Sequence, residues 1–319
     1  MTEIAMGKID VHHHVLPPEY VQKWKEASGI PKGLKLPSWD VELDLDFMNR
    51  NNISASVLSL SAPGLAFVKP ASEATVLCRW VNEYAAKVVT AHPTRFGFFA
   101  SVPPLDNMPA CLEEIRYALD VLKADGVALL SSYSDKYLGH SDFRPLWQEL
   151  DARNAVVFVH PTFAQTWGTP SDPSIPRPII DFPHETTRTA VHLITSNTIR
   201  DFPNLKIILS HGGGTLPYVA TRIAHQTADL GLKDKSAEDF IKEAKGFYFD
   251  LALTGYEGPV KVVSEFADEG HVLFGSDFPF AREVTIGPQI QRIAAVDMSD
   301  GARESIDYGA ARRLFPRFG

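Results

Sequence analysis

Short apolar runs alternate with amphipathic segments along almost the whole chain. Eight runs have the length and composition of buried β-strands, and each is followed by a segment whose apolar residues recur at helical spacing. The predicted strands cover residues 8–15, 53–60, 95–102, 126–130, 156–160, 206–211, 247–253 and 271–277. Strands that alternate with helices pair in parallel, and strands buried on both faces are apolar nearly throughout. The alternation therefore predicts a parallel α/β fold.

Eight such units in a chain of 319 residues predict a single (β/α)8 TIM barrel with loop insertions, spanning residues 1–319. The alternative is an open, doubly wound sheet. No glycine-rich dinucleotide fingerprint follows any predicted strand, because the glycines after His211 have the wrong spacing for one. Residues 17–40 are expected to form an irregular excursion. A proline-rich loop is expected after the fifth strand, up to about residue 182, and a helix over residues 183–200.

Composition narrows the classes of partner. The net charge is −8 and no basic run occurs, which disfavours nucleic acid as a ligand. No apolar run reaches the ~18 residues that a membrane span needs, and the N-terminus lacks the pattern of a signal peptide. The two cysteines, Cys78 and Cys111, lie in predicted helices, so a disulfide framework is not indicated. We expect a soluble, cytoplasmic protein without a membrane partner.

Three consecutive histidines lie in the first predicted strand. Because successive strand side chains alternate between faces, His12 and His14 are expected to point to one side, and Val11, His13 and Val15 to the other. Two histidines on one face can bind the same cation. The alternative is a histidine tag or a chance cluster, but the apolar residues around the histidines favour a core strand.

Other residues with metal or acid–base chemistry stand at the ends of later strands, where the active sites of barrels assemble. Together His12, His14, His160 and Asp277 offer three imidazoles and one carboxylate, a set suited to Zn²⁺ or Mn²⁺, and His211 is expected beside them. Each residue also has a structural alternative. His160 could cap a strand before a proline, His211 could shape a glycine-rich loop, and Asp277 could form an Asx turn.

The motifs that carry these residues resemble those of a known family. In order they are Asp10-x-His12-x-His14, His160-Pro161, Ser210-His211-Gly212-Gly213-Gly214 and Gly275-Ser276-Asp277-Phe278-Pro279. This order resembles the amidohydrolase superfamily, and more narrowly its branch of non-oxidative decarboxylases, which includes 2-amino-3-carboxymuconate-6-semialdehyde decarboxylase. The resemblance implies one metal bound by His12, His14, His160 and Asp277, with His211 as a catalytic group. Residues 126–133 contain no lysine that could be carbamylated, as in binuclear hydrolases of the superfamily, which favours one metal.

The resemblance implies a carbon–carbon lyase that releases CO₂ from an aromatic acid with an ortho hydroxyl group. The metal would hold the carboxylate and the hydroxyl, and Asp277 or His211 would protonate the ring carbon. The first expected substrate is 6-methylsalicylate, which would give m-cresol, and isoorotate and γ-resorcylate are alternatives. A lactonase or other hydrolase is a further alternative, because the same ligands can activate water. A non-enzymatic metal-binding barrel is the third.

Several residues near the proposed metal are candidates for a substrate pocket. Aromatic rings could wall a flat substrate, although they could equally pack a loop, and the small turn at residues 61–64 would leave room for an alkyl group. The candidates are Ser61, Phe163, Trp167, His184, Glu185, Phe278 and Phe280. The resemblance also implies a homodimer or a dimer of dimers, with residues 162–182 bordering the pocket and reaching a neighbouring subunit.

Overall fold

The computed structural model describes residues 7–28, 35–163, 172 and 174–319. Its parallel sheet has eight strands in the order β1-β2-β3-β4-β7-β8-β9-β10. They are β1 (Lys8–His14), β2 (Ile53–Ser59), β3 (Phe96–Ala100), β4 (Gly126–Leu130), β7 (Val156–His160), β8 (Lys206–Leu209), β9 (Tyr248–Asp250) and β10 (Val272–Leu273). The two edges of the sheet meet, since the Val11 N–H donates to the Phe274 carbonyl and His13 bridges to Phe278. The predicted barrel is therefore confirmed, and the open sheet is excluded.

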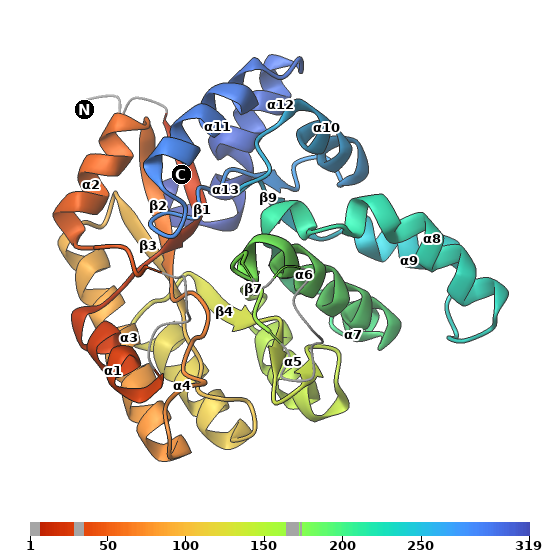
Figure 1. The fold of residues 1–319 in the computed structure, drawn as a ribbon. Coiled ribbons are helices and arrows are strands. Elements are labelled where there is room, and N and C mark those ends of the chain that lie inside the picture. Colours follow the sequence, from red (N-terminus) through yellow and green to blue (C-terminus); the bar gives the residue numbers. More distant parts are fainter. Residues whose placement is uncertain (1–6, 29–34, 164–171, 173) are drawn as a thin grey trace.

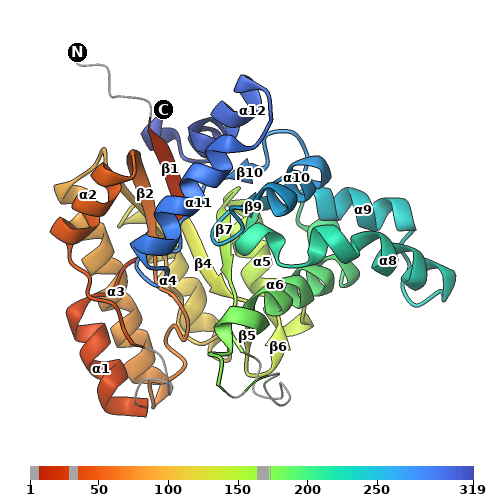
Figure 2. The same cartoon turned by 45° about the horizontal axis from the view of Figure 1, so that its top comes forward.

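Helices surround the barrel in chain order (Figure 1). They are α1 (Pro18–Ser28), α2 (Val41–Arg50), α3 (Ala71–Ala91), α4 (Met108–Asp120), α5 (Arg144–Ala152), α6 (Pro178–Thr195), α7 (Thr198–Asp201), α8 (Leu216–Asp229), α9 (Ala237–Lys245), α10 (Glu257–Phe266), α11 (Glu283–Ala295), α12 (Asp300–Glu304) and α13 (Ala310–Leu314). Figure 2 shows α1 to α4 on one side of the barrel and α5, α6, α8 and α9 on the other. A short hairpin, β5 (Ser132–Tyr133) and β6 (Lys136–Tyr137), follows β4. Among the described residues, no helix has both the length and the apolar character needed to cross a membrane.

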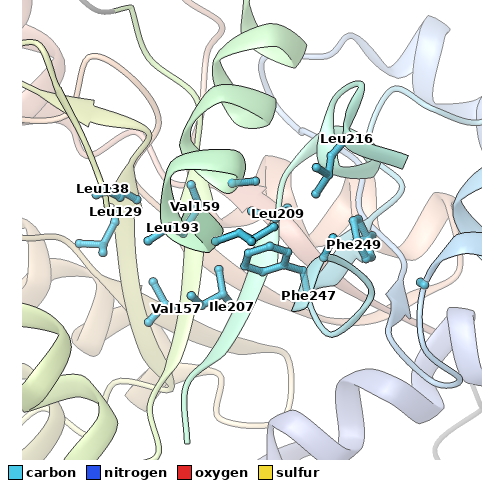
Figure 3. Packing of buried hydrophobic residues seen from close by; sticks show 14 of the residues in the cluster. Leu129, Leu138, Val157, Val159, Leu193, Ile207, Leu209, Leu216, Phe247 and Phe249 are labelled. Carbon is cyan, nitrogen blue, oxygen red and sulfur yellow. The ribbon is translucent and has the colours of Figure 1, made fainter. Parts of the chain in front are cut away.

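Alternate side chains of each strand enter two separate packing layers. Outward residues such as Val157 and Leu209 pack with Leu193 of α6 under the helices (Figure 3). Inward residues form a second cluster, in which the rings of Phe99 and Phe158 stack with their centroids 5.3 Å apart. Burying each such side chain contributes about 1.5–3 kcal/mol. Because the barrel interior is filled, a site can form only at the ends of the strands.

The segment after β1 is not the irregular excursion that the sequence suggested. Helix α1 occupies Pro18–Ser28, and its residues Tyr20 and Trp24, one turn apart, are both buried. The Trp24 ring stacks on Phe67, and the Tyr20 hydroxyl donates to the Gly64 carbonyl at 3.0 Å. Proline at the first helical position has no donor to lose there. The prediction for this segment was therefore wrong over the length of α1.

The helix after β7 begins earlier and ends earlier than predicted. It starts at Pro178 rather than Pro183, and its first turn carries an ion pair between Arg177 and Asp181 at 2.9 Å. Prolines are tolerated in a first turn, because its N–H groups have no partner within the helix. The helix ends before Asn197, whose φ of 61° is left-handed, and α7 is a separate turn. The expected loop up to residue 182 and helix over 183–200 are corrected accordingly.

Candidate metal centre

Between Asp10 and His13, strand β1 contains one residue more than the facing part of β2. Asp10 pairs with Ser56 and His13 with Leu58, so three steps along β1 match two steps along β2. Such a mismatch is a β-bulge, and it interrupts the regular alternation of side chains between the two faces of a strand. The bulge contains Val11 and His12.

The bulge brings neighbouring side chains to the same side of the strand. Val11 belongs to the inward cluster, and the ring of the next residue, His12, lies 5.0 Å from Phe158 of that cluster. His14 also faces inward, with its ring centroid 4.9 Å from that of His12. His13 faces outward. The expectation for His12, His14 and His13 is thus met, whereas the expectation that Val11 points away from His12 is wrong.

Four donor residues from three distant segments converge at the ends of the strands. Ligand atoms of His12, His14, His160 and Asp277 all lie within 4.8 Å of one another, and all four residues are buried. The Nε2 atoms of His12 and His14 are 3.1 Å apart, and Asp277 Oδ1 lies 3.4 Å and 3.0 Å from them. Ligands of a tetrahedral zinc ion, at about 2.0–2.2 Å from the metal, lie about 3.3–3.5 Å from each other. The donors therefore fit a small divalent ion.

The second ring nitrogen of each histidine is held by a different partner. His12 Nδ1 lies 2.9 Å from Asp250 Oδ2, and His160 Nδ1 lies 2.8 Å from the Pro161 carbonyl. His14 Nδ1 lies 3.1 Å from the hydroxyl and 3.3 Å from the carbonyl of Ser59. Such partners fix the tautomer and the orientation of a ligand, so each imidazole presents Nε2 to the centre.

Asp250 is a residue of the site that the sequence analysis did not single out. It is completely buried, and its Oδ1 also accepts the backbone N–H groups of His211 and Ala252 at 3.1 and 2.9 Å. One carboxylate thus orients His12 and anchors the segment that carries His211. The signal was available, because Asp250 is an acidic residue within an otherwise apolar predicted strand.

The electrostatic environment favours the cation-binding forms of His160 and Asp277 and places a proton on His12. Burial alone would lower the pKa of His12, but the carboxylates of Asp250 and Asp277 outweigh it and raise that pKa to about 10. Burial and the nearby imidazoles lower the pKa of His160 well below its usual value. Although burial raises the pKa of Asp277, hydrogen bonds from His12, His14 and His211 lower it well below its ordinary range. Histidine binds a metal as the neutral imidazole, and aspartate binds it as the ionised carboxylate. A metal cation at this site would therefore replace the proton on His12.

His211 lies beside the donors but outside their set. Its Nε2 is 3.7 Å from Asp277 Oδ2. The backbone of His211 and that of Asp277 are left-handed, with φ of 57° and 64°, a conformation that costs about 1–3 kcal/mol in residues other than glycine. The turn after His211 passes so close to α6 that a Cβ on Gly214 would lie 1.9 Å from the Pro183 carbonyl oxygen. Only glycine fits there, and the turn aims His211 at Asp277.

A cavity of about 130 Å³ adjoins the donors on the side of β2, β3 and β4. Its lining includes Leu60, Gly64, Ser101, Ala128, Leu130 and Phe163. The donors lie next to this lining, since Leu130 pairs with His160 across the sheet and Ser61 Oγ is 3.4 Å from His160 Nε2. An apolar cavity of about 150 Å³ holds one benzene ring. The cavity is therefore close in volume to one that holds a single aromatic ring, although its lining also includes polar residues such as Lys69 and Asp106.

Three of the predicted pocket residues lie at this cavity or beside the donors. Phe163 lines the cavity, Ser61 contacts His160, and the ring of Phe280 lies 5.4 Å from that of His14. Thr162 also lines the cavity, so the start of the segment 162–182 borders it as expected. Trp167 lies outside the described residues.

The other predicted pocket residues lie elsewhere. The ring of Phe278 stacks on Phe47 at 3.9 Å, on the outer side of β1. His184 is exposed on the surface of α6. Glu185 is buried and accepts a hydrogen bond from the Tyr137 hydroxyl at 3.0 Å. These positions do not support a pocket role for Phe278, His184 or Glu185.

A parallel barrel that gathers three imidazoles and a carboxylate at the ends of its strands has the architecture of a metal-dependent barrel enzyme. The family model described as Amidohydrolase matches residues 9–317, so this chain belongs to the amidohydrolase family. It is 48% identical over 326 residues to a decarboxylase of Aspergillus niger, with 98% of this chain and 88% of that protein covered. It is 43% identical to a 6-methylsalicylic acid decarboxylase of Penicillium expansum, with 98% and 97% covered.

A solved structure supports the same relationship. The crystal structure of a 2,6-dihydroxybenzoate decarboxylase in complex with 2,6-dihydroxybenzoate matches with a TM-score of 0.83 and 25% identity, covering 98% of this chain and all (100%) of that one. The predicted family and its decarboxylase branch are thereby confirmed.

Proposed function

We propose that this chain is a metal-dependent, non-oxidative decarboxylase of an ortho-hydroxybenzoic acid, and that 6-methylsalicylate, which would give m-cresol, is its substrate. The observation that carries this proposal is the convergence of His12, His14, His160 and Asp277 beside a cavity of about 130 Å³. The proposal is supported by relatives that are named decarboxylases, one of them for 6-methylsalicylic acid.

We assign one divalent ion to the four donors, with Zn²⁺ preferred to Mn²⁺ because three of the four donors are imidazole nitrogens. When bound, the ion would hold the carboxylate and the neighbouring hydroxyl group of the acid and act as a Lewis acid towards the phenolate. The second partners of His12, His14 and His160 keep the three rings in place for that task.

The proton for the ring carbon would come from His211. Ring nitrogens of His12, His14 and His211 lie 3.4, 3.0 and 3.7 Å from oxygens of Asp277, so the Asp277 carboxylate acts as an acceptor. His211 is then the adjacent group that can hold and donate a proton. Once the carbon that bears the carboxylate is protonated, the carbon–carbon bond breaks, its electrons restore the aromatic ring and CO₂ leaves.

Specificity would follow from the shape of the cavity. The side chains of Leu60, Leu130 and Phe163 offer apolar surface to a ring, and the small residues Gly64 and Ala128 leave room for a methyl group. Isoorotate also presents a carboxylate next to an oxygen, but its ring amides need polar partners, and each one left unpaired would cost about 1–3 kcal/mol.

Product analysis with metal-loaded protein tests the proposal. Purified protein is incubated separately with 6-methylsalicylate, γ-resorcylate, isoorotate and a lactone, and products are identified by mass spectrometry. We expect m-cresol and CO₂ in equal amounts from 6-methylsalicylate. Turnover of isoorotate alone would refute the substrate but keep the reaction, whereas turnover of the lactone alone would refute the decarboxylase.

We further propose that the chain works as one domain, in the cytosol, as a homodimer or a dimer of dimers. Cys78 and Cys111 are both buried and free, which fits a reducing compartment. The assembly is supported by the resemblance to dimeric decarboxylases. Light scattering that shows only a monomer at every working concentration would refute the assembly.

A further inference from the structure

His13 lies on the outer side of β1, where it is clamped between two carboxylates. Its Nδ1 is 2.9 Å from Asp10 Oδ2, and its Nε2 is 2.8 Å from Asp44 Oδ1. The second oxygen of Asp44 accepts the Trp39 Nε1–H at 2.8 Å. His13, Asp10 and Asp44 are fully buried, and Trp39 is 8% exposed. The His13 ring is therefore held by a carboxylate oxygen at each of its two nitrogens.

The same network holds two of the three chain segments that carry donors, those of His12 and of Asp277. Asp10 Oδ1 accepts the backbone N–H groups of His12 and Ser276, each at 3.1 Å. The His12 carbonyl in turn accepts the Asp277 N–H at 2.8 Å. Asp10 therefore fastens the bulge of β1 to the end of β10, although the two segments are far apart in the sequence.

The bulge decides which way the donors point. Val11 faces the interior, so a regular strand would turn His12 and His14 outward and His13 inward. A one-residue change of register moves every following side chain to the opposite face. The three-against-two pairing between Asp10 and His13 reverses that outcome, and the Asp10–His13 contact closes the bulge from outside.

We propose that Asp10, His13, Asp44 and Trp39 form a positioning network for the metal centre, which keeps the bulge in β1 and so turns His12 and His14 towards Asp277. His13 is a positioning residue here, because it contacts none of the four donors through its ring. The inference rests on the proposed metal centre. The alternative is that these four residues only stabilise the fold. Such a role would not need these particular residues, since a buried ion cluster can often be replaced by apolar residues at little cost in stability.

The experiment measures Zn²⁺ affinity by competition with a chromophoric chelator, together with the melting temperature of the protein. Three variants shorten the network in steps: His13→Gln, Asp44→Asn and Trp39→Phe. Asp44→Asn keeps the size of the side chain but removes one acceptor, so the contact with His13 or with Trp39 is lost. We expect a 10- to 100-fold weaker affinity for His13→Gln and Asp44→Asn, the scale for residues that orient ligands, and about 3- to 10-fold for Trp39→Phe.

Glu114→Gln is the matched control. Glu114 is 1% exposed and is bound by Arg79 and Asn82, each at 2.7 Å, so it is also a buried carboxylate in a polar cluster. It lies on α4 and contacts no donor in the described structure. We expect a lower melting temperature for this variant and Zn²⁺ affinity within about 2-fold of the parent, because general destabilisation does not by itself move the donors.

The outcomes separate the network from the metal centre. Unchanged affinity in Asp44→Asn and Trp39→Phe would overturn the network, and so would an equal loss of affinity in Glu114→Gln. If His13→Gln and Asp44→Asn do not fold, Trp39→Phe decides, because it removes the N–H at the end of the network, with part of the indole ring, and leaves His13, Asp10 and Asp44 unchanged. A parent protein that binds no Zn²⁺ would instead refute the proposed metal centre, and the network's role with it.

Discussion

The two halves of the barrel mouth are built in different ways. At the ends of β1 and β10, polar groups occupy both sides of the chain, with His12 and Asp277 inside and His13 outside, and nearly every ring nitrogen has a named partner. At the ends of β2 and β4, the cavity is lined in part by polar residues, but the side chains of Leu60 and Leu130 make contacts that have no direction. The donor half, at the ends of β1 and β10, fixes atoms through hydrogen bonds. The cavity half, at the ends of β2 and β4, provides space.

This difference determines how each half should respond to change. A buried polar network loses its function when one partner is removed, because the remaining groups stay buried without hydrogen bonds. Apolar contacts are lost roughly in proportion to the area removed. Substitutions in the donor half should therefore abolish metal binding or turnover, whereas substitutions in the cavity half should change KM in small steps.

The largest effect is expected from the donors themselves. His160→Ala and Asp277→Ala should each abolish tight metal binding, since either leaves three donors around a site that fits four. His12→Ala should do the same. Metal content is measured by elemental analysis after dialysis, with the exposed His225→Ala on α8 as control. Full metal occupancy in the three donor variants would contradict the assignment.

The next effect separates metal binding from proton transfer. His211→Asn should keep the metal and lower kcat by at least ~10²-fold, the usual scale for a lost acid–base group. Asparagine is the better substitute because it tolerates the left-handed φ of 57° at this position. Elemental analysis and steady-state kinetics are both required. A folded variant without metal would instead identify His211 as an essential ligand.

The sequence predicted the donors because their positions follow from the fold. In a parallel barrel the carboxyl ends of all strands meet at one rim, so His160 and Asp277 had to approach the first strand wherever the loops run. The aromatic residues lack such a constraint. Phe278 follows Asp277 directly but points to the other side, against Phe47, and sequence proximity alone could not show this.

The sequence could not show the bulge in β1. Regular alternation is the default for a strand, and the extra residue is held by contacts from remote segments, such as the Ser276 N–H and Asp44. The prediction from the sequence also failed at α1, where the burial of Tyr20 and Trp24 against other segments outweighed the loop-like composition of this part of the chain. Helices α2 and α9 were not predicted either, since both lie in connections between recognised elements.

A smaller effect is expected in the cavity half. Leu130→Ala removes three carbons from the lining and should raise KM for 6-methylsalicylate by up to about 60-fold, at roughly 0.8 kcal/mol for each carbon that the substrate contacts, with metal content unchanged. Leu193 of α6 gives the control, because it is buried in the outer layer under the helices and is not among the residues that line the cavity. Leu193→Ala should lower the free energy of unfolding by about 2–5 kcal/mol without changing KM. Equal KM values in the two variants would contradict the position of the substrate.

The smallest effects should appear where the two halves meet, at Ser59, the last residue of β2, and at Ser61, two residues further on. Ser59 Oγ contacts His14 Nδ1 at 3.1 Å, behind the donor, whereas Ser61 Oγ lies 3.4 Å from His160 Nε2, on the side of the cavity. Ser59→Ala should weaken Zn²⁺ affinity by no more than about 10-fold, because the Ser59 carbonyl remains 3.3 Å from the same nitrogen.

Ser61→Ala should leave Zn²⁺ affinity unchanged and raise KM by about 2- to 10-fold, the range for one lost hydrogen bond of about 0.5–1.5 kcal/mol. The two variants thus act as controls for each other, since each removes one hydroxyl group from the end of the same chain segment. Chelator competition and steady-state kinetics on both proteins locate the boundary between the halves. If Ser61→Ala weakens the metal and Ser59→Ala raises KM, the substrate approaches the donors from the opposite side, and the cavity beside β2 and β4 is not its binding site.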